Sequence, residues 1–284
     1  MIANLFTVAP LTPADLRRAL ADLLGVAPAA VDTADADGDQ EGRAWDAPVL
    51  CTLRRLPPGD LALELDVTVR DETAAGLTEG GLALGLAAGT GGSVLHPSDL
   101  DLPSAYWVAV PDGRVVRCRL EAIDAGPDDT AYRVEAAEGE IPDLPGARVE
   151  VLPEILDREP VATPVSDAFL ATFPAGDARS VAGHVHHDLR VWERLVRRLQ
   201  SDWAPSGRYR EDLFRRDLDA RDALERHIGG LGPDCAGALR EAVAALDQVF
   251  AAGTEADAAS AQDGEPDERA GWWRHRVPRR TPWE

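Results

Sequence analysis

His184, His186 and Asp188 are the side chains whose types and spacing point most directly to chemistry, because imidazole nitrogens and carboxylates bind metal ions. The residues around them predict an α-helix, however. On a helix His184 and Asp188 share a face while His186 points away, so these three cannot converge on one ion. His184, His187 and Asp188 could act as ligands only with a further partner such as His227. We therefore predict no metal and no cofactor here.

The H-x-H-x-D spacing also begins the metal motif of the metallo-β-lactamases, but Leu189 stands where that motif has its next His. No Gly-x-Ser-x-Gly nucleophile motif is present, and the absence of lysine removes P-loop and Schiff-base chemistry. Cys51, Cys118 and Cys235 are too far apart in sequence for a metal knuckle. A metal-dependent or hydrolytic enzyme that uses the His184–Asp188 region stays open as an alternative function.

The helix that carries these histidines is the clearest structural pattern in the sequence. Between residues 178 and 203 the apolar residues recur at steps of three and four, which predicts one buried helical face: Val181, Val185, Leu189, Trp192, Val196, Leu199 and Trp203. Four arginines fall on the opposite face: Arg190, Arg194, Arg197 and Arg198. Similar patterns predict helices over 208–228 and 233–253. Residues 156–253 are therefore predicted to form an α-helical bundle.

The first 155 residues show a different pattern. Thr12, Pro13 and Asp15 form a helix start, and Gly25 ends that helix. Alternating residues over 48–56 and 61–69 predict a hairpin, a weaker helix covers 78–88, and further strands follow up to residue 152. The predicted fold class is α+β, in which residues 1–155 form a mostly antiparallel sheet with helices on one face.

Charge separates the two halves further. The chain carries a net charge of −21; residues 1–155 hold 27 acids against 11 arginines, whereas residues 156–253 hold 16 against 13. An acidic domain disfavours nucleic acid and anionic membranes and favours a basic protein partner. No apolar run reaches the length of about 18 residues that a membrane helix needs. Three sparse cysteines are typical of reduced thiols, which predicts a cytoplasmic protein.

The densest acidic stretch lies between residues 32 and 42, which the sequence predicts to be a solvated loop. Its spacing does not fit a calcium loop, because Ala44 would stand where the twelfth-position Glu is needed. We predict that its five acids contact the basic partner: Asp32, Asp35, Asp37, Asp39 and Glu41.

Residues 254–284 change composition along their length. The stretch 255–268 is acidic and aperiodic, which predicts a mobile linker. After Gly271 three tryptophans alternate with arginines, and we predict that Trp272, Trp273, Arg274 and Trp283 dock against the body. Acids of the first half are the expected partners of these arginines.

Three short segments carry a resemblance to known sequences: Ala47-Pro48-Val49-Leu50-Cys51, Pro103-Ser104-Ala105-Tyr106-Trp107 and Gly271-Trp272-Trp273. They resemble segments of uncharacterised actinobacterial proteins whose style is similar to immunity proteins of bacterial toxin systems. The resemblance implies a cytoplasmic, non-catalytic protein that binds a toxin, and no functional residue carries over from it. A binding protein is thus the predicted function; a structural subunit of a larger assembly is a third possibility.

Overall fold

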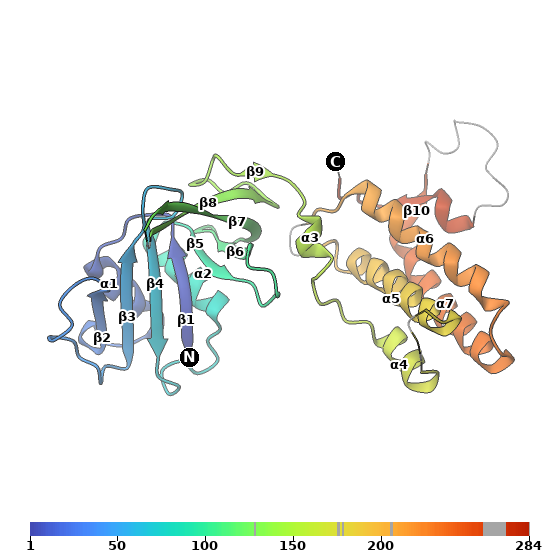
Figure 1. Cartoon of the computed structure of the whole chain (residues 1–284), viewed down its shortest axis with the longest axis horizontal. Helices are drawn as coiled ribbons and strands as arrows, with labels where there is room; N and C mark the ends of the chain where they lie inside the picture. The colour runs from blue at the N-terminus through green and yellow to red at the C-terminus, as the bar shows by residue number, and fades with distance from the viewer. Residues whose placement is uncertain (128, 175–176, 178, 205–206, 258–270, 284) are drawn as a thin grey trace. The chain divides into compact units, whose positions relative to one another are not determined.

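The computed structural model describes residues 1–127, 129–174, 177, 179–204, 207–257 and 271–283. The chain divides into two compact units, Met1–Glu159 and Pro160–Glu284. The boundary that the sequence predicts, between residues 155 and 156, lies close to this division. Over the described residues the protein contains a mixed nine-stranded sheet and seven α-helices, which confirms the α+β class (Figure 1).

The nine-stranded sheet lies in the first unit, with the strand order β2-β3-β4-β1-β5-β6-β7-β8-β9 over the described residues. Its strands are β1 (Ile2–Thr7), β2 (Val31–Asp35), β3 (Val49–Arg55), β4 (Leu63–Val69), β5 (Val94–Pro97), β6 (Ala105–Ala109), β7 (Val115–Gly126), β8 (Asp129–Ala137) and β9 (Arg148–Val149). The pairs β2–β3 and β8–β9 are parallel, and the other neighbours are antiparallel.

Two helices, α1 (Pro13–Leu24) and α2 (Glu79–Thr90), pack against each other and against the sheet, with the 3₁₀ turn η1 (Pro28–Ala30) after α1. The predicted start of α1 is present as a capping box, in which Asp15 N–H donates to the Thr12 hydroxyl and Thr12 N–H donates back to the Asp15 carboxylate. Gly25 ends the helix in the left-handed conformation, with φ of 64°. Leu16 and Leu20 are fully buried in the core between α1, α2 and the strands.

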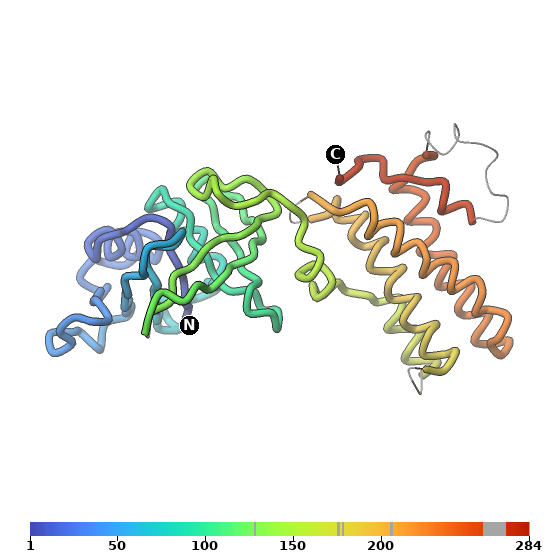
Figure 2. The backbone as a smooth tube through the Cα atoms, turned by 45° about the horizontal axis from the view of Figure 1, so that its top comes forward, coloured from blue at the N-terminus to red at the C-terminus, as the bar shows by residue number. Residues whose placement is uncertain are grey.

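The sheet is strongly curved, so that β7 and β8 lie across the ends of β3 and β4 (Figures 1 and 2). The turn between β3 and β4 touches β8 directly: Asp60 N–H donates to the Tyr132 carbonyl at 2.8 Å, and Val134 N–H donates to the Asp60 carboxylate at 2.8 Å. Gly59 packs so closely on Tyr132 that a Cβ there would lie 2.6 Å from the carbonyl oxygen, which requires a residue without a side chain. A second core, which includes Phe6 and Leu95, fills the inside of this curve.

Two strands of the nine-stranded sheet were not expected from the sequence, and neither were β10 (Thr254–Ala256) and β11 (Arg276–Pro278) of the second unit. β1 is a central strand although residues 1–10 show no alternation that predicts one, and β2 occupies the first part of the predicted acidic loop. The sequence Val-Asp-Thr-Ala-Asp has weak strand character, and pairing with β3 overrides it. Because β2 and β3 run parallel, the chain must cross from the end of one to the start of the other, which takes about a dozen residues.

The second unit contains α4 (Pro164–Thr172), α5 (Val181–Gln200), α6 (Glu211–Ile228) and α7 (Pro233–Gly253); a short helix, α3 (Pro153–Leu156), precedes the division. Helix α5 contacts α4, α6 and α7. Val185, Leu189, Trp192 and Val196 are buried as predicted, whereas Val181 at the start of α5 is 44% exposed. Pro205, which follows the predicted helical pattern of residues 178–203, lies outside the described residues.

Charged residues on α5 also enter the interior, which the predicted arginine face did not include. Glu193 is fully buried and accepts hydrogen bonds from the backbone N–H groups of Val165 and Ser166, so it caps the start of α4. Arg198 was predicted on the outer face but is 8% exposed, and it donates to the Tyr209 hydroxyl at 3.2 Å. The Tyr209 hydroxyl thus replaces the water that would hydrogen-bond to the Arg198 guanidinium if this side chain were exposed.

Candidate partner-binding surface

The acidic loop, residues 36–48, is the crossover connection between the parallel strands β2 and β3. It projects from its unit at the end of the sheet (Figure 2). Its start is turned by Asp35, whose carbonyl accepts from Gly38 N–H at 3.1 Å and from the Gln40 side-chain amide at 2.7 Å. The Asp35 carboxylate accepts from Asp37 N–H at 3.1 Å. A further local bond runs from Glu41 N–H to the Asp39 carboxylate at 2.8 Å.

Asp32 and Arg43 hold the loop to the sheet. Arg43 Nε donates to Asp32 Oδ2 at 2.8 Å, and the side chains of Arg43 and Asp32 are only 4% and 14% exposed, respectively. Arg43 Nη1 also donates to Thr52 Oγ1 at 2.8 Å, and Ala44 N–H donates to Asp32 Oδ1 at 3.2 Å. Partial burial on its own would raise the pKa of Asp32, but the hydrogen bonds from Arg43 and Ala44 lower it below its ordinary value. Asp32 therefore has an internal role.

Asp37, Asp39 and Glu41 are exposed, and within the described part of the chain no cation pairs with them. Beside them Trp45 is 61% exposed, with the Arg43 guanidinium 4.6 Å from its ring centre. Sequence reasoning missed both Arg43 and Trp45. Both could have been identified from the sequence, because each is the one residue of its kind, a cation and a large aromatic, within an acidic stretch. These three exposed carboxylates and the tryptophan together form what we call the loop surface.

The C-terminal segment docks within its own unit. It contains the 3₁₀ turn η2 (Trp272–His275) and β11 (Arg276–Pro278), which pairs with β10 (Thr254–Ala256). Trp273 is 6% exposed, and its indole N–H donates to the Asp222 carboxylate at 2.8 Å. The Arg221 guanidinium lies 4.0 Å from the centre of the Trp273 ring. Trp273 is thus held against α6 by an apolar contact, a hydrogen bond and a cation–π contact.

Two arginines of this segment pair with acids of the second unit, so for these two the expectation that acids of the first half would hold them is wrong. Arg274 forms ion pairs with Asp219 and Asp222 of α6, and Arg280 pairs with Asp202. Acids on one face of a helix can thus pair with a segment that comes later in the sequence and packs beside that helix.

The other two predicted tryptophans lie nearer the surface. Trp283 is half-buried with its ring 5.4 Å from that of Phe214, and Trp272 is 42% exposed with its ring 6.1 Å from that of Phe250. The predicted mobile stretch 255–268 falls mostly outside the described residues.

The His184–Asp188 region does not assemble a metal site. His227 Nε2 lies 3.5 Å from Asp188 Oδ2, and the rings of His184 and His227 are 5.9 Å apart. His186 points elsewhere and bonds to the Phe173 carbonyl at 2.7 Å. Burial raises the pKa of Asp188, and the nearby histidines only partly oppose this effect. Over the described residues, no group of three or more His, Cys, Asp or Glu side chains is placed to hold a metal ion.

The cysteines have no features of activated nucleophiles. Burial raises the pKa of the Cys51 thiol to about 12 and raises that of Cys118 as well. A nucleophilic cysteine requires the opposite shift, because the thiolate is the reactive form. Burial also raises the pKa of Cys235, which is half-buried.

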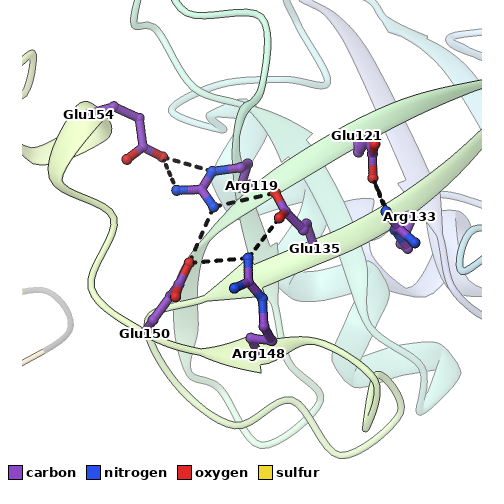
Figure 3. Close-up of polar contacts among 7 residues, drawn as sticks. All are labelled: Arg119, Glu121, Arg133, Glu135, Arg148, Glu150 and Glu154. Carbon is purple, nitrogen blue, oxygen red and sulfur yellow. Dashed lines mark hydrogen bonds and ion pairs between the residues drawn. The ribbon is translucent and has the colours of Figure 1, made fainter.

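At the far edge of the sheet, acids are neutralised by a closed network of ion pairs (Figure 3). Arg119 of β7 contacts Glu135 of β8 at 3.3 Å, Glu150 at 3.2 Å and Glu154 of α3 at 2.6 Å. Arg148 of β9 bridges Glu135 and Glu150. This arrangement, the Arg119 network, ties β9 and α3 to the sheet. It shows that an acidic unit can still neutralise many of its carboxylates internally.

Comparison of the chain with protein-family models, with curated proteins and with solved structures found no match. Among the described helices, none combines the length and the apolar character needed to cross a membrane. The loop surface is therefore the candidate site on its own geometry.

Proposed function

We propose that this protein is a non-catalytic binding protein that holds a basic protein partner on the acidic surface of its first unit, in the manner of a toxin-neutralising immunity protein. In this proposal the protein acts in the cytoplasm, the α+β unit carries the binding surface, and helices α4–α7 form a bundle that supports the C-terminal segment. The loop surface is the observation that carries the proposal.

The charge distribution around the loop supports this function. Arg43, the cation of the loop, is used by Asp32, so Asp37, Asp39 and Glu41 keep their full negative charge toward solvent. Exposed like charges repel one another and stabilise the fold little. A basic partner would relieve that repulsion and would be attracted from a distance. Trp45 adds an apolar surface of the kind that often dominates binding energy at interfaces.

The test uses the full chain to capture its partner from the native cell and then measures binding kinetics with the identified partner. A loop variant that combines Asp37→Asn, Asp39→Asn and Glu41→Gln removes three negative charges. A control variant that combines Glu72→Gln, Asp99→Asn and Asp101→Asn removes three charges from other exposed positions of the same unit. We expect the loop variant to lower the association rate more than the control does.

The association rate should also fall steeply as salt increases, because exposed charges are screened over about 8 Å at physiological ionic strength. A partner that is not basic, or that binds the loop variant and the wild type at equal rates at low salt, would refute the proposed function.

A further inference from the structure

The outer edge of β2 is an open strand edge beside the loop surface. Strand β2 ends the sheet and pairs on one side only, with β3. In a parallel pair the N–H and C=O of alternate residues point toward the neighbour. Ala36 N–H donates to the Leu53 carbonyl at 2.7 Å, so the even-numbered residues face β3. The backbone groups of Val31, Thr33 and Asp35 therefore point away from the sheet.

Some of these outward groups have partners and some do not. Val31 N–H donates to the Pro28 carbonyl, and the Asp35 carbonyl is occupied by Gly38 and Gln40. Over the described residues, the Val31 carbonyl, both backbone groups of Thr33 and the Asp35 N–H have no such partner. These groups have the spacing of the hydrogen-bonding groups along one side of a β-strand, so an added strand could form hydrogen bonds with all of them.

The space beside this edge is hollow. A depression of about 360 Å³ is lined by Val31 and Asp32 of β2, by Ala44 of the loop, and by residues of α1 and η1: Arg17, Pro28 and Ala29. A side chain of an added strand would lie in it. The open backbone groups and the hollow thus occupy the same edge.

Charge decides what can occupy this edge. The loop that follows β2 presents Asp37, Asp39 and Glu41, so a second copy of this strand would bring two sets of carboxylates together. A basic segment would instead pair with them. We propose that an extended, basic segment of the partner protein adds to β2 as a further strand of the sheet. This inference rests on the proposed function and specifies how the partner is held.

The opposite edge of the sheet, at β9, shows how this chain protects an edge against the addition of a further strand. Strand β9 has only two residues, and the Arg119 network covers its approach with paired charges. Short strands and charges at an edge prevent unwanted pairing. Strand β2 is longer, with five residues, and within the part of the chain that the structure describes only Asp32 among the acids next to it pairs with an arginine.

The experiment uses two synthetic peptides with five arginines each, so that charge is matched. One alternates Arg with Val and can form a strand; the other alternates Arg with Pro and cannot, because proline lacks the N–H and resists the ladder. Amide hydrogen exchange of the full chain is measured at low salt. We expect the Arg-Val peptide alone to slow exchange of the Thr33 and Asp35 amides, while the Asp32 amide, already directed at β3, stays unchanged.

A pair of variants tests the same edge by affinity. Thr33→Pro removes an outward N–H, which an edge strand tolerates, and Thr33→Val keeps it while removing the hydroxyl that contacts Arg17. We expect Thr33→Pro to weaken binding of the Arg-Val peptide by about five- to tenfold, as one lost hydrogen bond does. Thr33→Val should bind as the wild type does. If Thr33→Pro disturbs β2 itself, the exchange experiment on the wild type still decides the question.

Each other outcome overturns strand addition in a way that separates it from the proposed function. Equal, salt-sensitive binding of both peptides without slower exchange would leave the acidic surface as a binding site and remove the strand. No binding of either peptide would mean that the acids only prevent unwanted pairing at this edge. The proposed function would then be tested separately, by the binding kinetics of the captured partner. Slower Thr33 exchange at rising protein concentration without peptide would make a second copy the occupant.

Discussion

The acidic loop and the C-terminal segment both place tryptophan among charged residues, yet the structure uses them in opposite ways. In the C-terminal segment Trp273 is buried, and Arg274 pairs with Asp219 and Asp222. In the loop Trp45 is exposed, and no cation among the described residues forms an ion pair with Asp37, Asp39 or Glu41. A segment whose charges are paired within its own unit adds to stability and offers little to a partner. A segment whose charges remain unpaired adds little to stability and can bind.

The C-terminal side of this comparison predicts the largest effect. Trp273→Ala should lower the free energy of unfolding by about 3–5 kcal/mol, because a buried tryptophan leaves a cavity and Asp222 loses a donor. The measurement is urea denaturation of the full chain. Trp45→Ala is the matched control and should cost less than about 0.5 kcal/mol, as exposed positions do. Similar losses for both tryptophans would break the comparison.

The Arg119 network predicts the next effect in size, since it neutralises acids of the same unit that carries the loop. Arg119→Met leaves three glutamates close together without their shared cation and should cost about 1–2 kcal/mol. Arg133→Met is the control, because among the described residues Arg133 forms an ion pair with Glu121 alone and both side chains are about half exposed. Its cost should stay below about 0.5 kcal/mol. Both costs are measured by thermal and by urea unfolding. Equal costs for Arg119→Met and Arg133→Met would show that the network contributes no more than a surface pair.

The sequence predicted α+β and the course of most helices, because caps and apolar periodicity are local signals. The capping residues Thr12 and Gly25, for example, bound α1 as expected. Strand β2 was missed because its identity depends on β3, a neighbour that its own residues do not specify. The internal role of Asp32 was missed for the same reason, since Arg43 reaches it only once the loop has crossed the sheet.

Asp32 predicts a smaller, pH-dependent effect that divides the loop into a structural and an exposed part. Its pKa is lowered in the folded state, so its stabilisation is present above the ordinary value of about 3.9 and is lost as pH falls through the folded value. Asp32→Asn should therefore cost about 1 kcal/mol at pH 7, and this cost should shrink as pH falls through the folded pKa of Asp32. Asp37→Asn should leave stability unchanged at neutral and at acid pH. A cost of Asp32→Asn that persists at low pH would mean that the substitution disturbs the packing around residue 32 rather than removing a stabilising charge.

The smallest effect on stability belongs to the loop surface and is the most informative about binding. Combining Asp37→Asn, Asp39→Asn and Glu41→Gln should change the free energy of unfolding by less than about 0.5 kcal/mol. The change should be a slight gain at low salt, because the variant removes repulsion in a chain of net charge −21. The one local hydrogen bond from Glu41 N–H to Asp39 survives, since an asparagine oxygen can also accept it.

Salt provides the check on that reasoning. The gain should vanish at about 1 M salt, where charges are screened within about 3 Å. The control variant at Glu72, Asp99 and Asp101 should show the same small gain, because the repulsion belongs to the whole unit rather than to the loop. A loss above about 1 kcal/mol in the loop variant alone would show that these carboxylates hold structure, as Asp32 does. They would then no longer be free for a basic partner.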